Sequence, residues 1–253
     1  MEKTLKDGQQ KEVGKGEKLF RYILFGICEL FCLVSVLLFF VKGEPARAVA
    51  SLGTMCLVAA PVLLSKLFRL GINTVFFAFC ELYALGPMLG HAYKLYYYTP
   101  WWDDLLHTSG GVVFAVLGLY LAKLIGGKQE SNLLTKALFA LFFSMAISVL
   151  WEFIEYGLDT FFRMDMQSDS WVSFINSYLI GDATGVIGSM NGITEVIVDG
   201  VSLGGNGYLD IGLHDTMHDM LVETLGALAF FVVYLVDKER HTLLWTKPIT
   251  ENM

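Results

Sequence analysis

Charged side chains are scarce in this sequence. They make up 17% of its 253 residues, against about 25% in soluble globular domains. The charges also gather in a few short segments, and the apolar runs between them reach the roughly 20 residues that a transmembrane helix needs. This distribution excludes an ordinary soluble domain and predicts one polytopic membrane domain.

Basic residues are fewer than acidic ones, with 18 Lys and Arg against 25 Asp and Glu and a net charge of −7. We therefore expect neither a nucleic-acid partner nor a basic lipid-binding patch. The four cysteines all fall in apolar runs, which argues against a disulfide framework. The glycine-rich stretches are too irregular for a phosphate-binding loop, and no GxSxG serine elbow is present.

The apolar runs predict an all-α fold, a bundle of six transmembrane helices with a small extracytoplasmic loop subdomain. The predicted spans are Phe20–Val41, Ala48–Leu64, Ile72–Gly90, Asp104–Ile125, Leu133–Tyr156 and His214–Val236. The membrane domain covers residues 20–237, and polar tails cover residues 1–19 and 238–253. The first expected partner is thus the lipid bilayer.

The distribution of Lys and Arg predicts the orientation. A cytoplasmic N-terminus places all of them on the inner side except Lys42, Arg47, Lys94 and Arg163, in agreement with the positive-inside rule. Six spans then leave both termini in the cytoplasm. We expect a multi-pass protein of the cell's inner (cytoplasmic) membrane.

A long loop at residues 157–213 is then extracytoplasmic, and it is acidic and rich in glycine. Ile193–Val198 alternates β-branched with other residues, and Asp199–Gly200 is a turn signal before the run that begins at Val201. This pattern predicts a small β-hairpin. The aromatic and aliphatic residues of Ser170–Ile180 predict an interfacial helix. Loops of this length often serve as lids.

The sequence HDTMHDMLVE opens the last span. Helical spacing puts Asp215, Asp219 and Glu223 on one face, with His218 next to Asp219. Acids and imidazoles at the mouth of a membrane helix are costly unless they meet water, a partner or a metal. The segment is therefore a candidate functional site.

The six-span topology places ten ionisable residues at the same outer face. They are His91, Asp103, Asp104, His107, Glu152, Glu155, His214, Asp215, His218 and Asp219. Many are spaced i, i+3 or i, i+4, and bundle cores that bind two metals are built from such pairs on facing helices. We predict a divalent metal site, with Zn, Mn, Fe or Mg as the ion. The predicted ligands are Asp103, His107, Glu152, Glu155, Asp215 and Asp219.

Within this set, Glu152, Glu155 and Asp219 are also the predicted catalytic residues. Asp104, His214 and His218 are secondary candidates for metal ligands. An alternative for the aspartates that open helices, Asp103 and Asp215 included, is a role as caps and dipole partners. Glu152 and Glu155 fit that alternative poorly, because they lie at the C-terminal end of a helix, where acids are disfavoured.

Three segments resemble the YjdF-like family of bacterial inner-membrane proteins, a domain of unknown function. WDDLLHTSGG carries Asp103 and His107 at matching positions. WEFIEYGLD carries Trp151, Glu152, Glu155 and Asp159, with Gln167 downstream, and LDIGLHDTMHDM carries Asp210, Asp215 and Asp219. The resemblance extends from about Phe76 to Val236, whereas Asp104, His218 and Glu223 depart from the pattern. It implies a polytopic membrane protein and no particular activity.

Three functions follow from these observations. The first is a membrane-embedded, metal-dependent enzyme with an outward-facing site at headgroup depth, acting on a lipid-linked or phosphorylated substrate. The second is a cation or proton-coupled transporter in which Glu81, near the middle of the third predicted span, acts as a relay. The inner halves of the last three spans have few ionisable residues, which counts against it. The third is a membrane scaffold or sensor whose acidic loop binds a partner.

Overall fold

The computed structural model describes residues 14–68, 72–126 and 132–236. The chain divides into two compact units, residues 1–147 with 222–253 and residues 148–221. The predicted polar tails fall almost entirely outside the described residues. The exception is the end of the first tail, where helix α1 already begins at Lys15.

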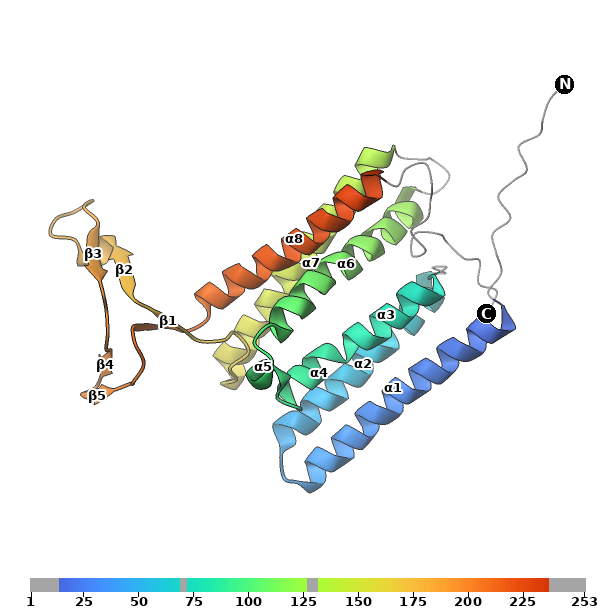
Figure 1. The fold of residues 1–253 in the computed structure, drawn as a ribbon, viewed down its shortest axis with the longest axis horizontal. Coiled ribbons are helices and arrows are strands. Elements are labelled where there is room, and N and C mark those ends of the chain that lie inside the picture. Colours follow the sequence, from blue (N-terminus) through green and yellow to red (C-terminus); the bar gives the residue numbers. More distant parts are fainter. Residues whose placement is uncertain (1–13, 69–71, 127–131, 237–253) are drawn as a thin grey trace. The chain divides into compact units, whose positions relative to one another are not determined.

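Among the described residues, five helices are long and apolar enough to cross a membrane, and each matches a predicted span (Figure 1). They are α1 (Lys15–Val41), α2 (Pro45–Phe68), α6 (Trp102–Gly126), α7 (Leu133–Phe162) and α8 (Leu213–Val236). The α7 helix continues past its predicted end at Tyr156, so the long loop is shorter than predicted at its N-terminal side. The mostly helical fold with several candidate membrane spans is thus confirmed.

The predicted third span, Ile72–Gly90, is divided into two helices, α3 (Thr74–Ala84) and α4 (Gly86–His91). The break falls at Leu85, two residues before Pro87. Proline has no backbone N–H, and its ring disfavours the helical conformation in the residue before it. Neither helix alone has the length of a membrane span. The six-span count therefore stays a prediction.

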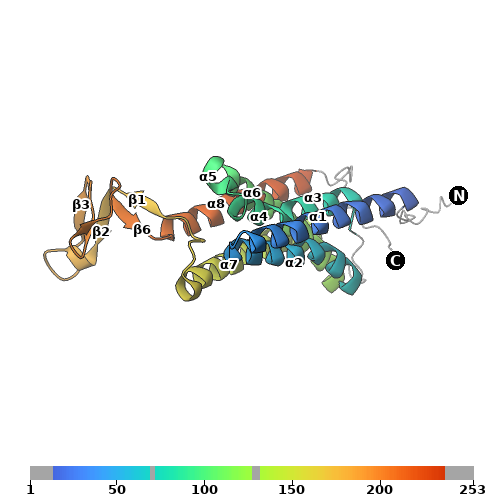
Figure 2. The ribbon, with the colours of Figure 1, turned by 90° about the horizontal axis from the view of Figure 1, so that it is seen from below.

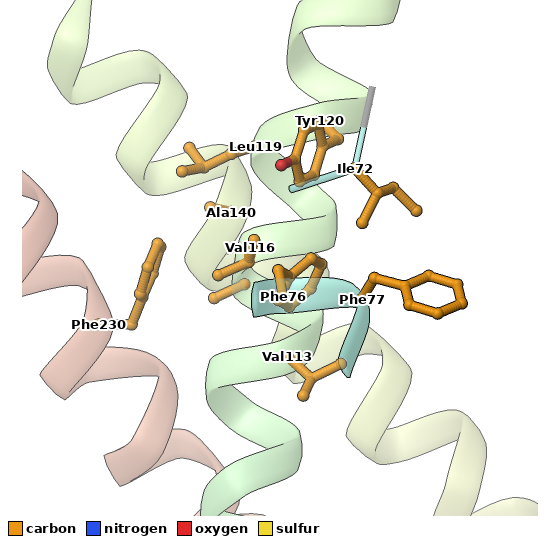
Figure 3. Packing of buried hydrophobic residues seen from close by; sticks show 10 residues of the cluster. Ile72, Phe76, Phe77, Val113, Val116, Leu119, Tyr120, Ala140 and Phe230 are labelled. Atoms are coloured by element: carbon orange, nitrogen blue, oxygen red, sulfur yellow. The ribbon is translucent and has the colours of Figure 1, made fainter. Parts of the chain in front are cut away.

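Two apolar cores hold the first unit together. In the first core, α1, α2 and α3 lie side by side (Figure 1), and its buried members include Cys28, Cys32, Phe39, Val58 and Met88. In the second core, α3 packs with α6 and with the first-unit parts of α7 and α8 (Figure 3). Its members include Phe76, Val113, Val116, Ala140 and Phe230. A short helix, α5 (Leu95–Tyr98), leads from α4 towards α6.

The loop of the second unit contains three antiparallel pairs of short strands (Figure 2). The pairs are β1 (Ser170–Val172) with β6 (Tyr208–Asp210), β2 (Phe174–Ser177) with β3 (Gly188–Asn191), and β4 (Ile197–Val198) with β5 (Val201–Ser202). The predicted hairpin is confirmed in the last pair. Its two turn residues, Asp199 and Gly200, have φ values of 51° and 80°, as a two-residue hairpin turn of type I′ requires.

The predicted interfacial helix at Ser170–Ile180 is wrong. The segment forms β1 and β2, and only its last three residues form a turn of 3₁₀ helix. Its strands are stabilised by partners elsewhere in the loop, since Ser170 lies opposite Asp210 and Phe174 opposite Asn191. Local composition does not carry this information, because apolar residues suit a short helix and a short strand alike.

Candidate functional site

Three buried carboxylates come together in the second unit. Glu152 and Glu155 lie one turn apart on α7, and Asp219 lies in the second turn of α8. One carboxylate oxygen from each residue lies within 4.8 Å of the others, and all three side chains are buried. They are the three predicted catalytic residues, and the structure brings them into one group.

An aromatic neighbour orients one member of this group. The indole Nε1–H of Trp151 donates a hydrogen bond of 2.9 Å to Oε1 of Glu155, one turn further along α7. A hydrogen bond to a charged acceptor is stronger than one between neutral groups. Trp151 therefore restricts the rotamer of Glu155 and keeps its carboxylate within reach of Glu152.

The chain that leaves α7 is fixed by Asp159. Its two carboxylate oxygens accept hydrogen bonds from the backbone N–H groups of Met166 (2.6 Å) and Gln167 (2.9 Å). This turn follows Arg163, which has a positive φ of 54°. The end of α7 is thereby held against the first residues of the loop.

The same loop residues then hold the start of α8. The side-chain amide of Gln167 donates to the hydroxyl of Thr216, and the N–H of Ser168 donates to Oδ2 of Asp215 at 2.7 Å. Asp210 accepts a hydrogen bond of 2.8 Å from the N–H of His214, as a cap of the helix. These contacts fix the first turn of α8, so that Asp219 emerges one turn later next to Glu152 and Glu155.

The electrostatics of the carboxylate group favour a bound cation or shared protons. Like charges this close cannot all ionise without a compensating charge, because each disfavours the ionisation of the others. The only Lys or Arg between residues 148 and 221 is Arg163, and its side chain is exposed. Oxygen donors of this kind suit a hard divalent ion such as Mg²⁺ or Mn²⁺. The donor set therefore fits a metal.

A second polar group lies in the first unit, around His107 of α6. Its Nε2 atom is 3.6 Å from Oδ1 of Asp103, and its Nδ1 atom is 3.7 Å from Oε2 of Glu223 on α8. His107 and Glu223 are both buried, whereas Asp103 is partly exposed. An imidazole between two carboxylates has a charge-compatible neighbour for each nitrogen.

Close packing of α6 on α8 brings Glu223 to His107. A Cβ atom on Gly111 would collide with the backbone carbonyl of Glu223, and one on Gly226 would collide with the carbonyl of Thr108. The two backbones can therefore approach only because glycine stands at both positions. The hydroxyl of Ser144 on α7 donates to the Gly111 carbonyl at 3.0 Å and adds a third helix to this contact.

The remaining predicted residues lie elsewhere. Asp104, His214, Asp215 and His218 belong to no set of three ligand atoms within 4.8 Å in the part of the chain that the structure describes. Asp215 instead accepts a backbone N–H, and His214 and His218 are exposed. Glu223 was absent from the predicted ligands, although its helical spacing from Asp219 was a usable signal.

Comparison with known proteins identifies the family. A family model described as "Predicted membrane protein (DUF2238)" matches residues 23–240, whereas no curated protein and no solved structure matches the chain. The match confirms the predicted membership in a family of membrane proteins, while the YjdF-like name stays a prediction. Together with the five long apolar helices of the described residues, it fits a multi-pass membrane location. The chain belongs to the family of predicted membrane proteins designated DUF2238.

Proposed function

We propose that this protein is a membrane-embedded, metal-dependent enzyme and that Glu152, Glu155 and Asp219 hold its divalent metal ion. The observation that carries the proposal is the approach of three buried carboxylate oxygens to within 4.8 Å of one another. Buried carboxylates are expensive unless they are paired, protonated or bound to a metal. A divalent cation compensates two of the three negative charges at one point, whereas a single proton compensates only one.

The ion depends on which further ligands join this group. The three carboxylates alone suit Mg²⁺ or Mn²⁺, and an imidazole would add Zn²⁺ and Fe²⁺ to the suitable ions. The sequence pattern adds Asp103, His107 and Asp215 to the proposed ligands, with Asp104, His214 and His218 as secondary candidates. The hydrogen bond from Ser168 to Asp215 makes Asp215 the least suited of the first three.

The residues around the proposed ion have distinct proposed roles. When bound, a metal would act as a Lewis acid that polarises a phosphoryl or carbonyl oxygen of the substrate. Glu152, Glu155 and Asp219 are the candidate proton acceptors, and Trp151 keeps Glu155 in position. His107 of the first unit, which lies between Asp103 and Glu223, is a proposed ligand on the sequence pattern alone. Orientation by an outer carboxylate is common for metal-binding histidines.

The location of the group suggests the class of substrate. Glu152 and Glu155 lie in the C-terminal half of α7, which continues to Phe162, and Asp219 lies in the second turn of α8. The C-terminal end of α7 and the N-terminal end of α8 both lead into the polar loop at residues 163–212. A site at the end of apolar helices is at headgroup depth, where the polar group of a lipid also lies. We therefore propose a lipid-linked or phosphorylated substrate.

Elemental analysis of the purified protein in detergent tests the metal. Wild type is compared with Glu152→Gln and Asp219→Asn after mild chelation, and Glu195→Gln, an exposed acid in the same unit, is the matched control. We expect near-stoichiometric metal in wild type and in Glu195→Gln, and none in the other two variants. The metallated protein would then be tested for hydrolysis of phosphorylated and lipid substrates.

The opposite result would end the proposal. If wild type, loaded with Mg²⁺, Mn²⁺, Zn²⁺ or Fe²⁺ in turn, retains no ion while circular dichroism shows a folded protein, the carboxylates are not a metal site. If metal is retained equally by all variants, it is bound elsewhere.

A further inference from the structure

A buried hydroxyl precedes the carboxylate group on α7. Ser148 lies in the second unit, four positions and one helical turn before Glu152. Ser148 is only 2% exposed, and its Oγ atom has no hydrogen-bond partner among the residues that the structure describes. A buried polar atom without a partner costs stability, so each one needs a physical explanation.

The other buried serines and threonines show how such hydroxyls are usually satisfied in this protein. In the part of the chain that the structure describes they are Ser35, Ser51, Thr54, Ser65 and Ser144. The first four donate to a carbonyl three or four residues earlier in their own helix, as helical serines commonly do. Ser144 donates to the carbonyl of Gly111. Ser148 is the exception, although it too lies within a helix.

Helix geometry places Ser148 beside the carboxylates of its own helix. Ser148, Glu152 and Glu155 are spaced i, i+4 and i+7 and are all buried, whereas the residues between them are exposed or partly exposed. Side chains on a helix lean towards its N-terminus, so the side chain of Glu152 covers the turn that contains Ser148. Helix neighbours at i, i+4 have Cβ atoms about 5–6 Å apart. One ion between these two side chains can therefore contact both.

The chemistry of a hydroxyl fits a hard ion among carboxylates. In P-loop NTPases, Mg²⁺ is held by a serine or threonine hydroxyl together with an aspartate. Ser148 would add a neutral fourth oxygen to those of Glu152, Glu155 and Asp219, which lie within 4.8 Å of one another. Mg²⁺ takes about six oxygen ligands and usually keeps several waters. Four protein oxygens thus leave positions for water or for a substrate oxygen.

We propose that Ser148 is a fourth oxygen ligand of the ion at Glu152, Glu155 and Asp219, and that this ion is Mg²⁺ or Mn²⁺. The inference rests on the proposed function, because it needs the metal site. Oγ of Ser148 coordinates the ion through a lone pair, and its proton stays in place. The metal-free protein then bears the cost of an open buried hydroxyl, and metal binding removes that cost.

Removal of the hydroxyl is the first test. Purified full-length protein in detergent is chelated and then titrated with Mn²⁺. We expect Ser148→Ala to weaken Mn²⁺ binding by at least the roughly 10-fold that loss of an outer partner costs. Metal-free Ser148→Ala should melt at the same or a higher temperature than metal-free wild type, because it lacks a buried polar group without a partner. Ser51→Ala, whose hydroxyl is bonded to the carbonyl of Arg47 on α2, is the matched control and should bind Mn²⁺ like wild type.

Replacement of the oxygen by sulfur tests direct contact with the ion. Thiolates prefer soft metal ions over hard ones, so Ser148→Cys should bind Mn²⁺ more weakly and Cd²⁺ more tightly than wild type. The Cd²⁺ complex should show the ultraviolet absorption band of a sulfur–cadmium bond, and Ser51→Cys should not show it. The four natural cysteines are present in every variant, so their contribution is removed by subtraction of the wild-type spectrum.

The outcomes separate this inference from the proposed function. Equal Mn²⁺ affinity in wild type and Ser148→Ala would overturn the role of Ser148, whatever the cysteine variant shows, and would leave the metal site intact. Weaker binding by Ser148→Ala without a sulfur–cadmium band in Ser148→Cys would also overturn it, since the hydroxyl would then act only through Glu152. If folded wild type binds no Mn²⁺ and no Mg²⁺, the metal site fails and this inference fails with it.

Discussion

The carboxylates near the adjoining ends of α7 and α8 fall into two groups with different surroundings. The first group accepts hydrogen bonds from backbone N–H groups, and its members are Asp159, Asp210 and Asp215. The second group is buried with its oxygens close to one another, and its members are Glu152, Glu155 and Asp219. The same chemical group, a few positions away in the chain, thus fixes the backbone in one case and concentrates negative charge in the other.

This difference separates the carboxylates that stabilise the backbone from those proposed to bind the metal. A carboxylate whose charge meets backbone N–H groups is stabilised in place by those hydrogen bonds. A carboxylate that faces other carboxylates gains from any cation or proton that binds. The resemblance to one family pattern covers residues of both groups, so the two roles are separated by geometry and not by motif.

The largest expected effect is on metal binding. Glu152→Gln and Asp219→Asn should each weaken metal affinity by more than the roughly 10–100-fold that loss of an outer partner costs. Because Asp215 already accepts a backbone N–H, we expect Asp215→Asn to keep its metal affinity; the ligand set predicted from sequence would have this variant lose it. Isothermal titration of the chelated, purified variants with Mn²⁺ measures the metal affinity of each. An equal loss of metal affinity in Asp215→Asn and Glu152→Gln would show that the two groups of carboxylates do not differ in metal binding.

The next effect concerns Asp159. Asp159→Ala removes the acceptor of two backbone N–H groups, those of Met166 and Gln167, at about 1–3 kcal/mol for each donor left without a partner. Hydrogen exchange at these two amides should accelerate, as mass spectrometry can measure. The control is Asp165→Ala, an exposed neighbour. If the amides of Met166 and Gln167 exchange at the same rate in Asp159→Ala and Asp165→Ala, Asp159 does not stabilise the turn.

A smaller effect is expected at the start of α8. Asp210→Ala removes the acceptor of the His214 N–H, and loss of a helix cap costs about 1 kcal/mol. Amide exchange in the first turn of α8 should rise, while the variant keeps its metal. Asp182→Ala, in an exposed part of the same loop, is the matched control. A fall in metal affinity in Asp210→Ala would show that the backbone-binding carboxylates also contribute to metal binding.

The smallest effect concerns Asp169, an exposed loop residue. Partial burial, and then the charges of Asp165, Asp159 and Asp210, raise the pKa of its carboxyl above the ordinary value of 3.8. Since the folded loop binds this proton more tightly than the unfolded chain does, the contribution to loop stability is greatest below pH 3.8. It is lost as the pH rises through the raised pKa.

Asp169→Asn should therefore slow amide exchange in the loop slightly near neutral pH and have no effect in acid. Nuclear magnetic resonance titration of the carboxyl carbon in wild type gives the pKa directly. A pKa of Asp169 at or below 3.8 would show that the neighbouring aspartates do not disfavour ionisation of its carboxyl group.

Local patterns in the sequence predicted much of the fold. Five spans were predicted within a few residues, because apolar length is a local property that the bilayer requires. The hairpin at Asp199–Gly200 was predicted because its turn needs positive φ values that few residue pairs adopt. The break before Pro87 was missed, although proline is a local signal, because the hydropathy of the segment is continuous across it.

The site was predicted in part. Helical spacing selected Glu152, Glu155 and Asp219, and the structure places their oxygens together, while metal binding stays a prediction. The hydrogen bond from Ser168 to Asp215 was not foreseen, because the two residues are far apart in the sequence. Strand pairing between Ser170 and Asp210 was missed for the same reason.

The sequence by itself determined which segments are apolar enough to enter a membrane and which helix faces carry carboxylates, because both depend on neighbours within one or two turns. The tertiary structure alone decided what each carboxylate meets. Glu223 reaches His107 because glycines at 111 and 226 let two backbones touch, and Glu81 is completely buried on α3, which packs on α1 and α2. Such contacts depend on distances between helices, and no single segment encodes them.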